Sequence, residues 1–171
     1  MKQMTAVTGF CALVFLTGAS LAQARTPDRR GKHQDEQFLR TIAIEDMTEA
    51  HLAQMAESKA AKPEVKELGQ TIAKDKTEEY EQLTVLASKV GESIPKGIDA
   101  RKDPAIHTLV SMKGGAFDRD FLRDEITEDR KMISTLQREA VHGENPDIKA
   151  WAEKMVDMCQ QELQKERSLA R

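Results

Sequence analysis

The chain has 171 residues, with 26 basic and 29 acidic side chains and a formal net charge of −3. This balance argues against a nucleic-acid partner, which requires a concentrated basic face. Only 4% of the residues are aromatic and no Val/Ile-rich alternating runs occur, so the composition favours helices and gives strands no support.

The first 24 residues have the pattern of a secretory signal peptide. Lys2 precedes an apolar run over residues 6–21, and Ala22-Gln23-Ala24 forms an Ala-x-Ala cleavage site. The run is too short for a stable bilayer span, and no later segment approaches twenty apolar residues. We therefore expect cleavage near Ala24, a periplasmic or secreted location and no transmembrane segment afterwards. Loss of Lys2 would leave 25 basic and 29 acidic residues, a net charge of about −4.

The residues after the cleavage site divide into a leader and one domain. Residues 25–34 are charged, contain Pro and Gly and lack apolar periodicity, which predicts a flexible leader. Residues 35–171 are long enough for a single domain with its own core. After cleavage only Cys159 remains, so we expect no intramolecular disulfide.

Apolar positions spaced by three and four residues predict two helices in the first half of this domain. The first covers residues 35–60. The second begins at Pro63, where a proline suits the first helical turn, and ends at Gly91. The connection between them is short, so we expect these two helices to be antiparallel.

Two more long helices are predicted in the second half. A connection over residues 91–115 contains a short helix that starts at Pro104. The next long helix covers residues 116–141, and Gly143 after it is expected to adopt the left-handed conformation of a helix cap. The last helix begins at Pro146 and ends near residue 169.

An internal repeat relates the two halves. Residues 38–66 match residues 121–149 at an offset of 83 positions without a gap, although chance similarity between helical segments is an alternative explanation. The matched pairs include Asp35 and Asp118, Pro63 and Pro146, and Glu79 and Glu162. Two equivalent hairpins related by a pseudo-twofold require a connection that returns along the bundle. We therefore predict an all-α, ferritin-like four-helix bundle with one long crossover.

Charged residues interrupt the middle of each apolar stripe. They are Glu45, Asp46, Glu49, Asp75, Lys76, Glu79, Asp129, Arg130 and Glu162. Burial of an unpaired charge costs several kcal/mol, so charges that face the core must pair or hold a cation. The alternative is that half of them point into solvent.

A metal site is one interpretation of these charges. Glu49, Asp75, Asp129 and Glu162 could bind iron or manganese, because carboxylates in a bundle core are ligands for these metals. However, di-metal bundles carry Glu-x-x-His on two helices, and only Glu139 to His142 fits that motif here.

Several segments together resemble a known family. They are Phe38-Leu39 with Glu49, Pro63 to Lys66, Ile72 to Asp75 and, most specifically, Gly114 to Leu122. They are similar to an exported bacterial family with a ferritin-like four-helix domain, domain of unknown function 4142. The resemblance covers residues 35–169 and implies the fold and export, because the family has no established biochemical activity.

The chain departs from this family at three positions. Where the family pattern has histidines, this sequence has Lys76, Arg130 and Glu162. Together with Glu49, these side chains would form a neutral ion-pair cluster. Two fixed cations would repel a divalent ion, so we expect no metal cofactor at the family's position.

No nucleophile with a base, phosphate-binding loop or cofactor fingerprint is present in the sequence. We therefore expect a non-catalytic envelope or stress-related protein. A ferritin-like metal-binding protein or oxidase that uses core carboxylates is the alternative. A protein partner or self-association stays open.

Overall fold

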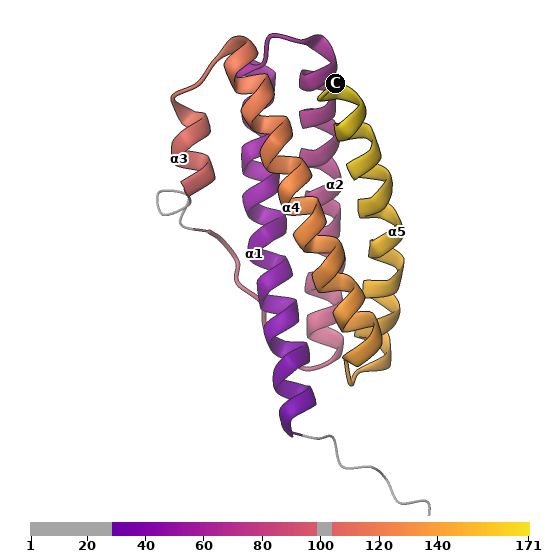
Figure 1. Cartoon of the computed structure of the whole chain (residues 1–171). Helices are drawn as coiled ribbons and strands as arrows, with labels where there is room; N and C mark the ends of the chain where they lie inside the picture. Colours follow the sequence, from indigo (N-terminus) through magenta and orange to yellow (C-terminus); the bar gives the residue numbers. More distant parts are fainter. Residues whose placement is uncertain (1–28, 99–103) are drawn as a thin grey trace, which may run out of the picture.

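A computed structural model of the chain describes residues 29–98 and 104–171. Its helices are α1 (Arg29–Lys59), α2 (Pro63–Lys89), α3 (Pro104–Val110), α4 (Gly114–His142) and α5 (Pro146–Leu169). The four long helices lie side by side, and the short α3 lies outside them (Figure 1). The predicted signal peptide, residues 1–24, lies outside the described residues.

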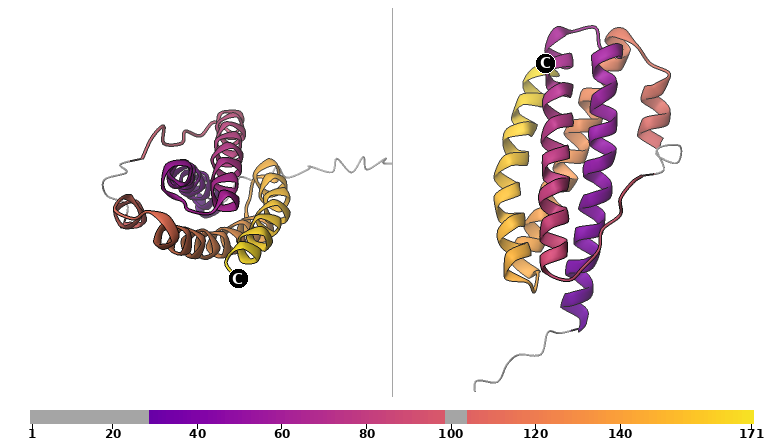
Figure 2. Two further views of the ribbon diagram at one scale, coloured as in Figure 1. Left: turned by 90° about the horizontal axis from the view of Figure 1, so that it is seen from above. Right: turned by 180° about the vertical axis from the view of Figure 1, so that it is seen from behind.

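The long helices form a four-sided bundle. α1 contacts α2 and α4, and α5 contacts α2 and α4, so α1 and α5 lie diagonally opposite (Figure 2). α2 finishes at one end of the bundle and α4 begins at the other end (Figure 1). Neighbouring helices are therefore antiparallel, which confirms the ferritin-like bundle with one long crossover and a short helix in that crossover.

The helix ends follow the local chemistry, with two differences from prediction. Asn145 caps α5, because its side chain accepts hydrogen bonds from the backbone of Asp147 and Ile148. Gly91 has a φ of 77°, as expected after a helix. Gly143 is not left-handed, since its φ is −58°, and a Cβ there would lie 2.8 Å from the Glu139 carbonyl oxygen. The predicted flexible leader is also shortened, because residues 29–34 already belong to α1.

Two aspartates join the hairpins in the same way. Asp35 in α1 accepts hydrogen bonds from the backbone N–H groups of Glu144 and Asn145, at 2.9 and 2.8 Å. Asp118 in α4 accepts hydrogen bonds from Ala61 and Lys62, at 2.9 and 3.1 Å. The members of the two sets are 83 positions apart throughout. Each hairpin therefore supplies the acceptor for the turn of the other, as a pseudo-twofold requires.

The apolar core is divided by a charged layer. One cluster gathers residues near the start of α1, the end of α2, the end of α4 and the first part of α5. A second cluster gathers the opposite parts of α1, α2 and α4. Lys76 and the buried acidic residues Asp46, Glu49, Glu79, Glu125 and Asp129 lie between these clusters along the helices. The charges thus occupy the middle of the bundle, where they must satisfy one another or hold protons or cations.

α1 and α2 pack unusually closely at Gly69. A Cβ at that position would lie 2.5 Å from the Ala56 Cβ and 2.7 Å from the Ala53 carbonyl oxygen. Glycine is therefore required by the close approach of the helices. The equivalent position in the second hairpin is Ala152, which is fully buried.

Candidate functional site

Lys76 lies at the centre of the charged layer. It is 1% exposed, and its Nζ lies 3.3 Å from Glu49 Oε2, 3.3 Å from Glu79 Oε2 and 3.4 Å from Glu162 Oε2. Burial disfavours the ammonium, but these three carboxylates outweigh that effect and raise the pKa of Lys76 well above its usual value. The side chain is therefore a permanent internal cation shared by α1, α2 and α5.

Asp46 faces the same layer without a hydrogen-bond partner. Its side chain is fully buried, and neither carboxylate oxygen has a hydrogen-bonding partner among the described residues. Burial, followed by the charge of Glu79, raises its pKa well above the usual range. Burial therefore favours the protonated form of this carboxyl group.

The second hairpin adds three more buried carboxylates, Glu125, Asp129 and Glu166. Burial, with Glu166 as the next cause, raises the pKa of Asp129 to about 9. Burial raises the pKa of Glu166 to about 7, with Glu162 adding to it, and a hydrogen bond from Asp129 opposes this shift. A hydrogen bond between two carboxyl groups requires a proton, so Asp129 and Glu166 share one. Burial also raises the pKa of Glu125 well above its usual value.

The structure brings together three members of the predicted ion-pair cluster, Glu49, Lys76 and Glu162, and excludes Arg130. The prediction for Arg130 is wrong, because its side chain is exposed. Asp129 takes the inward position, and the next residue is turned by about 100° around the helix. The cluster is consequently not neutral: Lys76 is the one buried basic residue in the described part of the chain, among many acidic ones.

The residues do not fit the two-metal site of ferritin-like oxidases. Lys76 occupies the space between Glu49 and Glu162, and Asp75 is only half-buried. The single Glu-x-x-His motif ends at His142, which is exposed at the end of α4. Its Glu139 instead accepts a hydrogen bond from Gln34, at 3.1 Å. The four carboxylates proposed from sequence therefore do not form one shared pair of metal positions.

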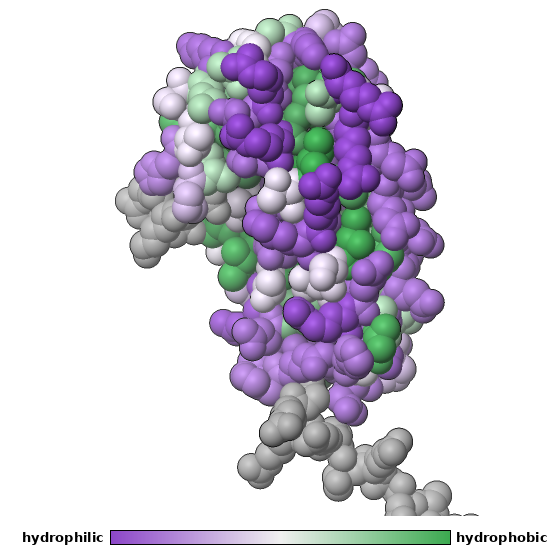
Figure 3. All heavy atoms as spheres, in the orientation of Figure 1, coloured by the Kyte–Doolittle hydropathy of each residue, from purple (hydrophilic) through white to green (hydrophobic). Residues whose placement is uncertain are grey.

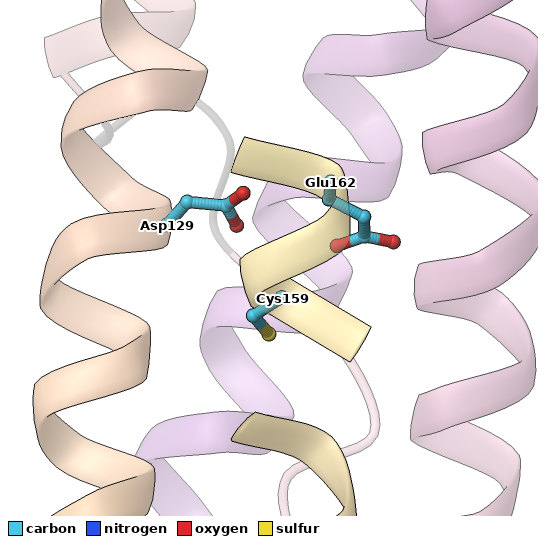
Figure 4. Close-up of side chains that lie close together, drawn as sticks. All are labelled: Asp129, Cys159 and Glu162. Carbon is cyan, nitrogen blue, oxygen red and sulfur yellow. The ribbon is translucent and has the colours of Figure 1, made fainter. Parts of the chain in front are cut away.

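A smaller group lies between α4 and α5. Asp129, Cys159 and Glu162 each present a potential ligand atom, and these atoms lie within 4.8 Å of one another (Figure 4). Cys159 is a free, buried thiol. Burial raises its pKa far above the usual value, with Lys76 opposing the shift, so in this environment the group is a neutral thiol unless a cation binds it.

Sequence reasoning missed Glu125, Glu166 and the position of Cys159. A signal was present, because Glu125 and Asp129 are spaced by four residues, as are Glu162 and Glu166, which places each pair on one helix face. The repeat also indicated the position of Cys159, because this residue lies 83 positions after Lys76 and is therefore its equivalent in the second hairpin.

Fold and site together define the class: a ferritin-like four-helix bundle with an acidic central layer and an internal lysine. The model of a family described as a domain of unknown function, DUF4142, matches residues 20–169. The chain belongs to that family, which confirms the resemblance noted in the sequence. Among curated proteins, none matches this sequence.

Solved structures share the fold at low sequence identity. A DUF305 fragment from Deinococcus radiodurans superposes with a TM-score of 0.70 at 15% identity, covering 80% of this chain and 95% of that one. A putative secreted DUF305 protein from Streptomyces coelicolor has a TM-score of 0.68 at 14% identity, covering 80% and 91%. CopM in a Cu(II)-bound form has a TM-score of 0.64 at 20% identity, covering 80% and 96%. These likenesses describe the fold.

The described helices give no candidate for a membrane-spanning segment. None of them combines the length and the apolar character that crossing a bilayer requires. The face shown in Figure 3 is mostly hydrophilic, with apolar side chains visible in stripes along the helices.

Proposed function

We propose that this chain is an exported, non-catalytic helical-bundle protein of the bacterial envelope, in which an internal ammonium replaces a resident metal. Export is supported by the basic, apolar and Ala-x-Ala segments of residues 1–24. A secreted-protein neighbour with the same fold agrees with that assignment.

The position of Lys76 carries the proposal. Its ammonium binds Glu49 and Glu162, two of the four carboxylates that an iron or manganese oxidase would use, and it also binds Glu79. A divalent ion placed between Glu49 and Glu162, where the ammonium lies, is repelled by several kcal/mol at an effective dielectric of about 20. The family's histidine positions offer no imidazole here, so the centre supports the bundle and has no redox role.

Surface recognition is then the remaining way for the protein to act in the envelope. On the face shown in Figure 3, hydrophilic side chains predominate around the apolar stripes. Such a surface suits contacts with soluble partners or with other copies of the chain.

Two measurements test this proposal. Mass spectrometry of protein from the periplasmic fraction should find an N-terminus at Arg25, and uncleaved chain held in the cytoplasm would contradict export. Addition of Fe(II) and oxygen to the purified chain should give no binding of two irons per chain and no accelerated oxidation of iron. Stoichiometric di-iron binding with rapid oxidation would instead establish the ferritin-like oxidase.

A further inference from the structure

The second hairpin carries a group of metal-ligand side chains that the proposed function does not use. Asp129 projects from α4 toward α5, and Cys159 and Glu162 project from adjacent turns of α5 (Figure 4). We propose that these three residues bind one divalent metal ion of the zinc class, at a site that shares Glu162 with the Lys76 ion pairs. This inference goes beyond the proposed function and holds whether or not the protein is exported.

The ligand chemistry suits zinc and its close relatives. Zinc accepts thiolate sulfur at about 2.3 Å and carboxylate oxygen at about 2.1 Å, which places ligand atoms about 3.5 Å apart in a tetrahedral site. The three ligand atoms here lie within 4.8 Å, so the site forms by closing about 1 Å. Three protein ligands leave the fourth position for water. Glu162 also pairs with Lys76 through Oε2, so its carboxylate would bridge the ammonium and the metal.

Asp129 points independently to a missing cation. Its side chain is 3% exposed, and its Oδ2 has no hydrogen-bond partner among the described residues. A buried carboxylate oxygen without a partner is costly, and coordination of a cation removes that cost. The same oxygen lies on the residue that Figure 4 shows directed at α5.

The pseudo-twofold supplies a second argument. At the offset of 83 residues, Asp129, Cys159 and Glu162 are the equivalents of Asp46, Lys76 and Glu79. In the first hairpin these three positions include a cation, because the Lys76 ammonium pairs with Glu79. In the second hairpin both carboxylates are kept, and Cys159, a potential metal ligand, replaces the lysine.

The surrounding charge also favours a cation in the second hairpin. Glu125 and Glu166 stand where the first hairpin has Ile42 and Leu83, so two apolar core positions have become acidic. The positive charge of Lys76 is offset by its ion pairs with Glu49 and Glu79 as well as with Glu162. A dication near Asp129 is therefore surrounded by acidic side chains that can release their protons when it binds, and the exposed Arg130 adds no buried positive charge.

Cobalt is the probe that reports the thiolate directly. The full exported chain, stripped with a chelator and titrated with Co(II), should bind one equivalent and develop a sulfur-to-cobalt charge-transfer absorption, which one equivalent of Zn(II) should abolish. Titration without that absorption, or without a stoichiometric end point, would overturn the proposal.

Matched variants locate the site. Cys159→Ser should remove the charge-transfer absorption and weaken zinc binding by at least about tenfold, and Asp129→Asn should weaken it to a similar extent. Asp46→Asn is the control, because it makes the same change at the equivalent position of the first hairpin, and it should leave zinc affinity within about threefold. Equal losses for the two asparagine variants would place the metal elsewhere and contradict the proposal.

A gain-of-site variant provides the converse test. Lys76→Cys gives the first hairpin the same three ligand types as the second, so cobalt stoichiometry should rise from one to two. Circular dichroism first checks that each variant is folded. A folded Lys76→Cys protein that binds a single equivalent would contradict the pseudo-symmetric argument, and the paired asparagine variants decide the case if this variant does not fold.

Discussion

The two hairpins share one backbone plan but neutralise their buried acids differently. In the first, Lys76 supplies a fixed ammonium that contacts Glu49 and Glu79. In the second, Cys159 takes the equivalent position, and Asp129 and Glu166 share a proton. The comparison shows that a repeat can preserve helix packing while its central chemistry diverges.

The difference also explains why the charged layer can exist at all. Burying several carboxylates around one ammonium is unfavourable unless the remaining acids hold protons or bind a cation. Glu162 links the halves, because it belongs to the second hairpin and pairs with the lysine of the first. A substitution in the charged layer of one hairpin should therefore alter the electrostatic environment of the other.

The largest expected effect comes from removing the ammonium. Lys76→Met leaves three carboxylates without their cation, so the free energy of unfolding at pH 7.5 should fall by about 3–5 kcal/mol. Urea denaturation measures the change, and the loss should shrink at pH 5 because the acids can protonate. Lys74→Met is the control, since Lys74 forms an exposed pair with Glu78 and should cost less than about 1 kcal/mol. Similar losses in the two variants would show that the internal cation is not special.

The next effect is a fall in stability as pH rises. Asp129 has a folded-state pKa of about 9 against a usual value of 3.8, so the folded protein holds a proton that the unfolded chain releases between these values. This contribution is complete below the unfolded pKa and is lost as pH rises through the folded one. With chelator present, we expect a loss of about 2–4 kcal/mol between pH 5 and pH 8 in urea denaturation.

A substitution at Asp129 sharpens that prediction. Asp129→Asn mimics the protonated acid and should flatten the pH dependence. Asp157→Asn, at an exposed position on α5, should leave it as in the unmodified chain. A stability that rises from pH 5 to pH 8 would contradict the assignment of buried protons to the second hairpin.

The reciprocal aspartates should show equal effects. Asp118→Asn and Asp35→Asn each weaken two charge-assisted hydrogen bonds to a turn of the other hairpin, so each should cost about 2–3 kcal/mol by urea denaturation. Asp120→Asn is the control, because it loses only a partly exposed pair with Arg123 and should cost under about 1 kcal/mol. A large effect of one of these aspartate substitutions and none of the other would contradict the proposed equivalence of the two hairpins.

The smallest effect concerns the helix contact at Gly69. Gly69→Ala forces α1 and α2 apart and should lower stability by about 1–3 kcal/mol, measured as a fall in Tm. Gly97→Ala introduces the same methyl group where nothing lies within 4 Å and should have little effect. An unchanged Tm for Gly69→Ala would mean that the first hairpin can relax to the spacing of the second.

The fold could be predicted from the sequence because the features that indicate it are local. Pro63, Gly91 and Pro146 mark helix limits, and the apolar spacing places one face of each helix inward. The gapless repeat then implied the crossover. These features need no knowledge of distant contacts.

The central layer was less accessible, because it depends on helix rotation. A rotation of one residue exchanges Asp129 for Arg130 at the inward face, and the sequence pattern does not resolve that difference. The role of Asp118 likewise depends on a turn 56 positions away in the chain. Such roles require the relative placement of the two hairpins, which emerges only in three dimensions.

The hydrogen bonds from the turn of each hairpin to an aspartate of the other hairpin affect the order in which the chain folds. As the polypeptide is synthesised, the N–H groups of Ala61 and Lys62 remain without their acceptor until Asp118 has emerged, well after both helices of the first hairpin. The turn amides of each hairpin are thus protected only when the other is in place. Amide hydrogen exchange at Lys62 and Asn145 should therefore occur through the same global opening, so that neither hairpin behaves as an independent foldon.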